Sequence, residues 1–426
     1  MKFGSKGPTG PQRHPVSKIP TSKNWVIVLC ILQALLVVPY CSNALPWAYG
    51  QGHFPIRPAL YLLFVGSLNF LWVIGKSPDW TKTSLLVVLL LVLRAVDAAV
   101  LQRFTYPDGH STAVFGLFAA VFMAVILFTS AGVMHRTSYL PALVTSASTI
   151  VICVVSLIAE WLGFFDFTIV DGRFSGFAGD PNRACVVMNL MLGIFLVLNK
   201  RFWPNMGMIA LTAIGVFPTL SRGGLMILTL IAISYIVLNF HRHPGKILLA
   251  AAAAVPAILI GVGLLAAKGA ANGKKDSNVE ERIGAIFGGE VSGLQSNDRM
   301  KDLTDGLEAV SSAPVTGLGT GAGTNLYQPH NQIISLWIDL GLIGPAIYCT
   351  ILALLCWKTI SSQLRSIYLT IPLVLYFPLS QALVENHAYF YAFAIALVVS
   401  SRSFLSVRLA QPAQQIWQSR SLSNRV

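Results

Sequence analysis

Long apolar runs separated by short polar breaks recur along almost the entire chain. A helix needs roughly 17 to 25 such residues to cross about 30 Å of hydrocarbon, and most of these runs reach that length. Lipid offers the backbone no hydrogen-bond partners, so the runs are expected to be helices and not isolated strands. Of 426 residues, 54% are hydrophobic and 11% are charged, which exceeds what the core of a soluble domain requires. The sequence therefore predicts an all-α, polytopic integral membrane protein with about twelve transmembrane helices.

The expected helices follow from the boundaries of these runs. They cover residues 25–41, 57–75, 84–102, 113–134, 140–164, 184–199, 205–219, 224–240, 247–267, 332–357, 366–383 and 388–401. The runs at 184–199 and 205–219 are short, so about ten to thirteen crossings are compatible with the sequence. The chain divides into an N-terminal tail (1–24), a first set of helices (25–267), a loop subdomain (268–331), a second set (332–403) and a C-terminal tail (404–426).

Lys and Arg concentrate in the two tails and in alternate short loops. The loops that hold them contain Lys76, Lys82, Arg136, Lys200, Arg201, Arg242, Lys246, Lys358 and Arg365. Because cytoplasmic loops retain positive charge, we expect both termini in the cytoplasm and the 268–331 loop outside. This bias also explains most of the net charge of +13. No basic stripe with interleaved aromatic residues stands outside the runs, so membrane lipids are expected partners and nucleic acid is not.

The outward loop carries the features that point to chemistry. We expect short helices over 278–287 and 298–311, the second with Asp298 as its N-cap. The glycine-rich run GLGTGAG at 317–323 is interpreted either as a flexible connector or as backbone that approaches a polar ligand closely. His330 follows it, and its imidazole suits removal of a proton from a hydroxyl near neutral pH. A solvated or structural histidine is the alternative.

Several arginines break the rule that basic residues stay inside. Arg173 and Arg183 flank the turn GDPN, Arg222 lies in TLSRGG, and Arg282 and Arg299 lie in the long loop. A single arginine at the bilayer edge often reaches phospholipid headgroups. Several on one face predict a site for a diphosphate, because the guanidinium fork binds phosphate oxygens in pairs.

These segments together resemble the O-antigen ligase and Wzy-type polymerase superfamily. His330 and Asn331 are followed by nine residues, then Gly341, two residues and Gly344, as described for O-antigen ligases. The likeness rests on GFAGDPNRA (176–184), TLSRGG (219–224), NDRMKDLTDGLEAVSSAPVTGLGTG (297–321) and HNQIISLWIDLGLIG (330–344). Polymerases and protein O-oligosaccharyltransferases carry related signatures, so ligase and polymerase both remain open.

The resemblance implies a glycosyltransferase of GT-C type in the bacterial inner membrane, with its active site facing the periplasm and one large periplasmic loop bearing short helices. The donor would be a polysaccharide on undecaprenyl diphosphate, and the acceptor of a ligase would be lipid A core oligosaccharide. Neither a metal nor a cofactor is expected.

The resemblance also implies roles for individual residues. His330 would be the general base or would position the acceptor, and Arg222 would take part in catalysis. The donor diphosphate would be bound by Arg183, Arg222, Arg299 and, less closely matched, Arg282. Supporting roles would fall to Asn331, Gly341, Gly319 and Arg173. Asp180, in GDPN, stands where related sequences often have an uncharged residue.

Two further features favour or oppose a transporter. Arg94 and Asp97 lie three apart on one helix face, where we expect a structural ion pair, with proton coupling as the rival interpretation. Transporters typically contain internal repeats, and the single late loop argues against such repeats.

The segment ENHAYFY at 385–391 is expected to border the site and to contact acceptor sugar through its aromatic residues.

Overall fold

The fold is described here from a computed structural model. The described residues are 22–76, 80–105, 110–167, 173–249, 293–362, 364–380, 383 and 386–400. Most of both tails, most of the expected 247–267 span and the expected 278–287 helix lie outside them.

Every regular element within the described residues is a helix, as predicted. The first half contains α1 (Lys23–Cys41), α2 (Ala44–Gly50), α3 (Pro58–Ile74), α4 (Lys82–Val96) with a π-helical turn η1 (Asp97–Leu101), α5 (His110–Arg136), α6 (Leu140–Trp161), α7 (Pro181–Leu198), α8 (Phe202–Val216) and α9 (Arg222–Asn239). The second half contains α12 (Gly293–Ser312), η4 (Gly323–Tyr327), α13 (Gln332–Leu340), α14 (Ile343–Ser362), α15 (Ile367–Leu375) and α16 (His387–Val399).

Seven helical stretches in the described part are long and apolar enough to cross a membrane. They are Lys23–Cys41, Lys82–Leu101, Ala113–Arg136, Leu140–Trp161, Pro181–Leu198, Arg222–Asn239 and Ile343–Ser361. Three shorter apolar helices accompany them, over Pro58–Ile74, Leu364–Leu375 and His387–Val399. The prediction of an all-α membrane protein is confirmed, and the count of about twelve crossings stays a prediction.

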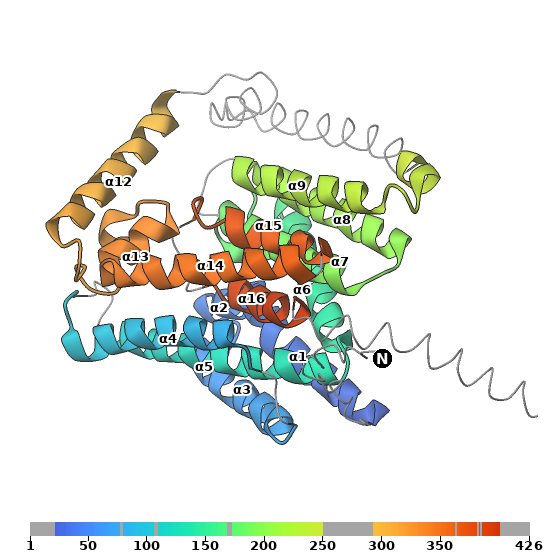
Figure 1. Cartoon of the computed structure of the whole chain (residues 1–426), viewed down its shortest axis with the longest axis horizontal. Coiled ribbons are helices and arrows are strands. Elements are labelled where there is room, and N and C mark those ends of the chain that lie inside the picture. Colours follow the sequence, from blue (N-terminus) through green and yellow to red (C-terminus); the bar gives the residue numbers. More distant parts are fainter. Residues whose placement is uncertain are drawn as a thin grey trace, which may run out of the picture.

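The bundle has buried helices at its centre, and the helices around them expose large apolar side chains. Figure 1 shows α16 between the α14–α15 layer and the layer formed by α4 and α5, and α16 packs against both α5 and α7. Every residue from Ala388 to Val399 is buried. By contrast, outer helices expose large apolar side chains such as Leu71 (70%) and Ile360 (75%). Such exposure is typical of surfaces that face lipid.

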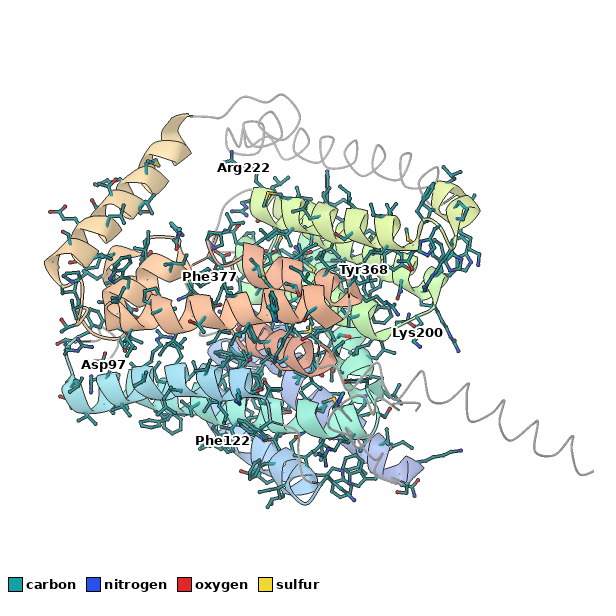
Figure 2. All side chains as sticks on the ribbon, viewed as in Figure 1. Asp97, Phe122, Lys200, Arg222, Tyr368 and Phe377 are labelled. Carbon is teal, nitrogen blue, oxygen red and sulfur yellow. The ribbon has the colours of Figure 1, made fainter. Side chains whose placement is uncertain are left out.

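The two ends of the bundle carry different polar residues. Figure 2 shows Asp97 and Lys200 at opposite ends, with Lys200 in a loop predicted to be cytoplasmic. Helices α12 and α13 lie at the end that holds Asp97 (Figure 1). Residues predicted to face outward therefore gather at this end, which we call the α12 end.

The expected span 332–357 is wrong as a single helix. It consists of α13 and α14, separated at Gly341, which has a positive φ of 64°. A Cβ at Gly341 would lie 2.0 Å from the carbonyl oxygen of Val315. The chain breaks here because another segment approaches so closely that only glycine fits. The hydrophobic run hides the break, since both helices are apolar.

The expected loop helix 298–311 begins earlier than predicted. Because α12 starts at Gly293, Asp298 lies inside the helix and is not its N-cap. Further along, Ala309 and Val310 pack with Ala322 and Ile338 in a small cluster separate from the main core. This cluster joins α12, the glycine-rich run and α13 into one unit.

Candidate active site

Two loops at the α12 end, residues 173–183 and 219–224, are joined by hydrogen bonds, and we call them the arginine loops. Arg173 is only 7% exposed. Its Nε donates to the carbonyl of Thr219 at 2.8 Å, and its guanidinium also donates to Asn182 Oδ1 at 3.2 Å. Ser221 Oγ donates to the same Asn182 oxygen at 2.9 Å. Arg173, predicted as a supporting residue, thus holds the two loops together.

Each arginine loop leads into the N-terminus of a helix. Asp180 caps α7 by accepting the amides of Asn182 (2.7 Å) and Arg183 (2.9 Å). This gives the unusual aspartate of GDPN a structural role. Ser221 caps α9, accepting the amide of Gly224 at 3.3 Å, and Arg222 is the first residue of that helix. A helix N-terminus carries partial positive charge and favours anions.

Glycine lets the starts of α7 and α9 approach each other. A Cβ at Gly224 would lie 2.5 Å from Cys185 Sγ, so a larger residue would push the helices apart. Asn189 Nδ2 donates to the carbonyl of Gly224 at 2.9 Å across the same contact. The side chains of Arg183 and Arg222 are both exposed, and Figure 2 shows Arg222 at the end of α9 nearer α12. Two exposed arginines therefore stand at helix starts that pack together.

A buried glutamate that the sequence reasoning missed fixes the first arginine loop. Glu160, at the end of α6, is 6% exposed. Its Oε2 accepts the amides of Ser175 and Gly176, both at 2.8 Å, and its Oε1 accepts the amide of Phe167 at 3.2 Å. A lone glutamate in an apolar run was the available signal, because such residues are costly in a membrane protein unless they are bound.

His330 occupies a strained position immediately before α13. Its φ is 49° and that of Gln328 is 44°, values uncommon outside glycine and frequent at functional sites. Asn331, predicted as a supporting residue, caps α13 by accepting the amides of Ile333 (2.9 Å) and Ile334 (3.3 Å). His330 is therefore not the cap of this helix, and its side chain is 47% exposed.

Asp302, on α12, is the carboxylate that faces this histidine. Its Oδ2 lies 3.6 Å from His330 Nε2. The contact brings α12 against the segment just before α13, where a Cβ at Gly306 would also lie 2.9 Å from Pro329 Cβ. The sequence analysis did not single out Asp302, because only the folded chain shows which face of α12 meets His330.

The segment between α15 and α16 contacts both α13, which follows His330, and α9, which begins at Arg222. The amide of Gln332 donates to the carbonyl of Phe377 at 3.1 Å, and Gln332 Oε1 accepts the amide of Leu383 at 2.7 Å. On the other side, a Cβ at Gly223 would lie 3.5 Å from Leu379 Cδ1. Figure 2 shows Phe377 and Arg222 in this part of the molecule. His330 and Arg222 thus belong to one end of the bundle.

The ion pair expected between Arg94 and Asp97 is wrong. Arg94 pairs with Asp339 of α13 at 3.2 Å, and Asp97 pairs with Arg103, whose Nε lies 2.7 Å from Asp97 Oδ1. Asp97 begins a π-helical turn that ends at Leu101, and its partner Arg103 follows that turn. Both aspartates also accept amides of the glycine-rich loop, residues 317–323.

Gly319, predicted as a supporting residue, packs on protein backbone. Its φ is 108°, and a Cβ there would lie 2.7 Å from Arg103 Cβ and 2.9 Å from the amide nitrogen of Phe104. Its own amide donates to the carbonyl of Asp339 at 3.1 Å. In this structure, Gly319 and Gly341 both accommodate close approach of another part of the chain.

The remaining predicted residues have different outcomes. Arg282 and Glu385 lie outside the described residues, and Arg299 belongs to α12 while its side chain is not described. Asn386 caps α16. The expected sugar contact through the aromatic residues of ENHAYFY is wrong, because Tyr389, Phe390 and Tyr391 are at most 3% exposed within the bundle.

Comparison with known proteins bears on this end of the molecule. A family model described as O-antigen ligase matches residues 207–349, which include Arg222, Arg299 and His330. A search of curated proteins gives no match. The resemblance seen in the sequence is thereby confirmed for residues 207–349, the part of the chain that matches the O-antigen ligase family model.

Proposed function

We propose that this protein is an O-antigen ligase, which transfers a polysaccharide from undecaprenyl diphosphate to lipid A core oligosaccharide at the periplasmic face of the bacterial inner membrane. One observation carries the proposal. The Arg173–Asn182–Ser221 hydrogen bonds fasten together two helix starts, each of which exposes an arginine. This arrangement is suited to a diphosphate, and the family match supports a lipid-linked glycan as the donor that carries it.

The arginines account for donor binding and for stabilisation of the leaving group. Arg183 and Arg222 supply guanidinium donors that match phosphate oxygens in pairs. The N-termini of α7 and α9 add the partial positive charge of their amides. As the bond to the sugar breaks, negative charge grows on the diphosphate, and donors fixed in advance stabilise that charge. Arg299 and Arg282 remain further candidates for this role.

His330 accounts for activation of the acceptor. An acceptor hydroxyl oxygen forms a bond to the anomeric carbon of the donor sugar, the bond from that carbon to the diphosphate oxygen breaks, and the hydroxyl proton passes to the imidazole. Undecaprenyl diphosphate leaves with the electron pair of the broken bond. Asp302, 3.6 Å from His330 Nε2, stabilises the imidazolium that forms.

A Wzy-type polymerase would use the same chemistry with a different acceptor, a second glycan on the lipid carrier. The lipopolysaccharide profile of a strain that lacks this gene distinguishes the two. Loss of every glycan-capped form supports the ligase. Survival of lipid A core capped with a single repeat would identify a polymerase, and an unchanged profile would contradict both.

A further inference from the structure

We infer that Asp339 and Asp97 are positioning residues for the transfer reaction, because they lock the glycine-rich loop against α4 and thereby fix α12 and α13. Asp302 lies on α12, and His330 immediately precedes α13. The inference rests on the proposed function, and it assigns the loop a mechanical role in place of the ligand contact that its composition suggested.

Asp339 holds the loop from the α13 side. Its Oδ1 accepts the amides of Gly321 (3.1 Å) and Gly323 (2.9 Å), while its Oδ2 lies 3.2 Å from a guanidinium nitrogen of Arg94. The side chain is completely buried, and that of Arg94 is 1% exposed. A buried carboxylate is stable only where it is paired and hydrogen-bonded. The loop amides are therefore part of what keeps this charge in place.

Asp97 holds the neighbouring part of the loop from the α4 side. Its Oδ2 accepts the amide of Thr320 at 2.6 Å, and its Oδ1 accepts Nε of Arg103 at 2.7 Å. Arg103 in turn donates to the carbonyl oxygens of Thr316 and Gly317. The loop is thus fixed through both its amides and its carbonyls.

Backbone contacts between the loop and the end of α13 complete the attachment. The amides of Leu318 and Gly319 donate to the carbonyls of Ile338 (2.7 Å) and Asp339 (3.1 Å). The loop amides from Leu318 to Gly321, together with that of Gly323, donate to protein acceptors. A flexible connector would leave such groups to water. A loop that cradles phosphate would point them at the ligand.

The loop connects α12, which carries Asp302, to α13, which His330 immediately precedes. Residues 313–331 connect α12 to α13, and Trp337 Nε1 of α13 donates to the carbonyl of Pro314 at 2.8 Å. The cluster of Ala309, Val310, Ala322 and Ile338 is small and separate from the main core. Leu336 and Leu340 place α13 in the main core, whereas α12 contributes only to the small cluster. The polar attachment of the loop to α4 therefore helps to fix where α12, with Asp302, meets His330.

We call the contacts of Asp97 and Asp339 with the glycine-rich loop the latch. Their distance from the arginine loops predicts which kinetic constant the latch controls. Neither aspartate contacts the arginine loops in the hydrogen bonds described above, so Arg183 and Arg222, which bind the donor diphosphate in this scheme, keep their geometry when the latch is lost. A displacement of about 1 Å in a reacting group can lower a rate on the order of 10²-fold. Loss of the latch should therefore lower kcat and leave the donor KM unchanged.

Two double variants test the inference, Arg94→Met/Asp339→Asn and Arg94→Met/Asp339→Leu. Both remove the buried charge pair, so neither leaves a lone buried charge. They differ in whether an oxygen remains to accept the amides of Gly321 and Gly323. The leucine variant should lose about 10²-fold in kcat, and the asparagine variant should recover most of it.

Hydrogen–deuterium exchange of the purified protein provides a readout independent of activity. The amides of Gly321 and Gly323 should exchange slowly in the wild type and in the asparagine variant, and rapidly in the leucine variant. Equal exchange in the two variants would overturn the latch. Equal kcat, or a donor KM that rises with the loss of kcat, would overturn the positioning role.

Asp97→Leu and Asp97→Asn repeat the comparison without disturbing a buried pair. Arg103 is 29% exposed, so it reaches solvent when Asp97 is lost, and folding of the leucine variant is easier to keep. Faster exchange of the Thr320 amide and a lower kcat are expected for Asp97→Leu. An unaltered exchange rate and an unaltered kcat would contradict the inference.

Glu308→Gln is the control and should change neither readout, because Glu308 is an exposed carboxylate on α12. A wild type that transfers no glycan would contradict the proposed function and the positioning role together, while exchange would still decide whether the aspartates hold the loop.

Discussion

The arginine loops can be compared with the histidine unit, which comprises α12, the glycine-rich loop and α13. The same kind of hydrogen bond fixes both regions, but they pack differently against the rest of the protein. In each, a buried carboxylate accepts backbone amides, Glu160 in the first and Asp339 in the second. The arginine loops lead into α7, of which 83% is buried. The histidine unit reaches the main core only through α13, and it has in addition its own small cluster and a polar attachment to α4. Donor binding should therefore withstand damage to the histidine unit.

We assign binding of the diphosphate chiefly to Arg183 and Arg222 of the arginine loops, and proton removal to the histidine unit. Stability usually varies across a structure with the number of buried apolar contacts, and α12 of the histidine unit lies outside the main core to which α7 belongs. We therefore expect the two regions to be separable by mutation, with substitutions in the arginine loops acting on donor binding as well as on rate.

Arg222 gives the largest expected effect. Arg222→Ala should abolish transfer and weaken donor binding while membrane insertion stays normal. Arg222→Lys should also be impaired, because an ammonium group lacks the paired fork. Arg242→Lys is a matched control, since this exposed arginine follows the opposite end of α9. Full activity of Arg222→Lys, measured per correctly inserted protein, would show that paired binding is wrong.

His330 should affect the rate alone. His330→Ala should lose roughly 10² to 10⁴ of the transfer rate, which is the usual contribution of a positioned general base. Affinity for the undecaprenyl diphosphate glycan should change little, because the arginines bind the diphosphate. His241→Ala, at an exposed histidine beyond α9, should leave both quantities unchanged. If donor affinity fell together with rate in His330→Ala, the two regions would not be separable.

Asp302 should give the smallest effect. Its contact with His330 is partly exposed, with the two side chains 38% and 47% accessible. Exposed ion pairs typically contribute about 0.2–1 kcal/mol, so Asp302→Asn should lower kcat by no more than about fivefold. The effect should vanish in a His330→Gln background, where no imidazolium forms. A fall of the same size in that background would assign Asp302 a purely structural role.

Sequence reasoning succeeded where a local pattern determines the structure. The apolar runs predicted nearly every described helix, because a span must be long and hydrophobic. It failed where distant segments meet. The partner of Arg94 is 245 residues away at Asp339, and no spacing rule connects them. Asp302 was missed for the same reason, and the break at Gly341 was hidden because α13 and α14 are both apolar.

The decisive test of the proposed ligase reaction is glycan transfer by the purified protein. The protein is reconstituted in lipid with undecaprenyl diphosphate glycan and lipid A core oligosaccharide. We predict that glycan appears covalently on the lipid A core and that an equal amount of undecaprenyl diphosphate is released. Arg222→Ala and His330→Ala should both prevent this. Glycan that only lengthens on the lipid carrier, or no transfer at all, would contradict the account.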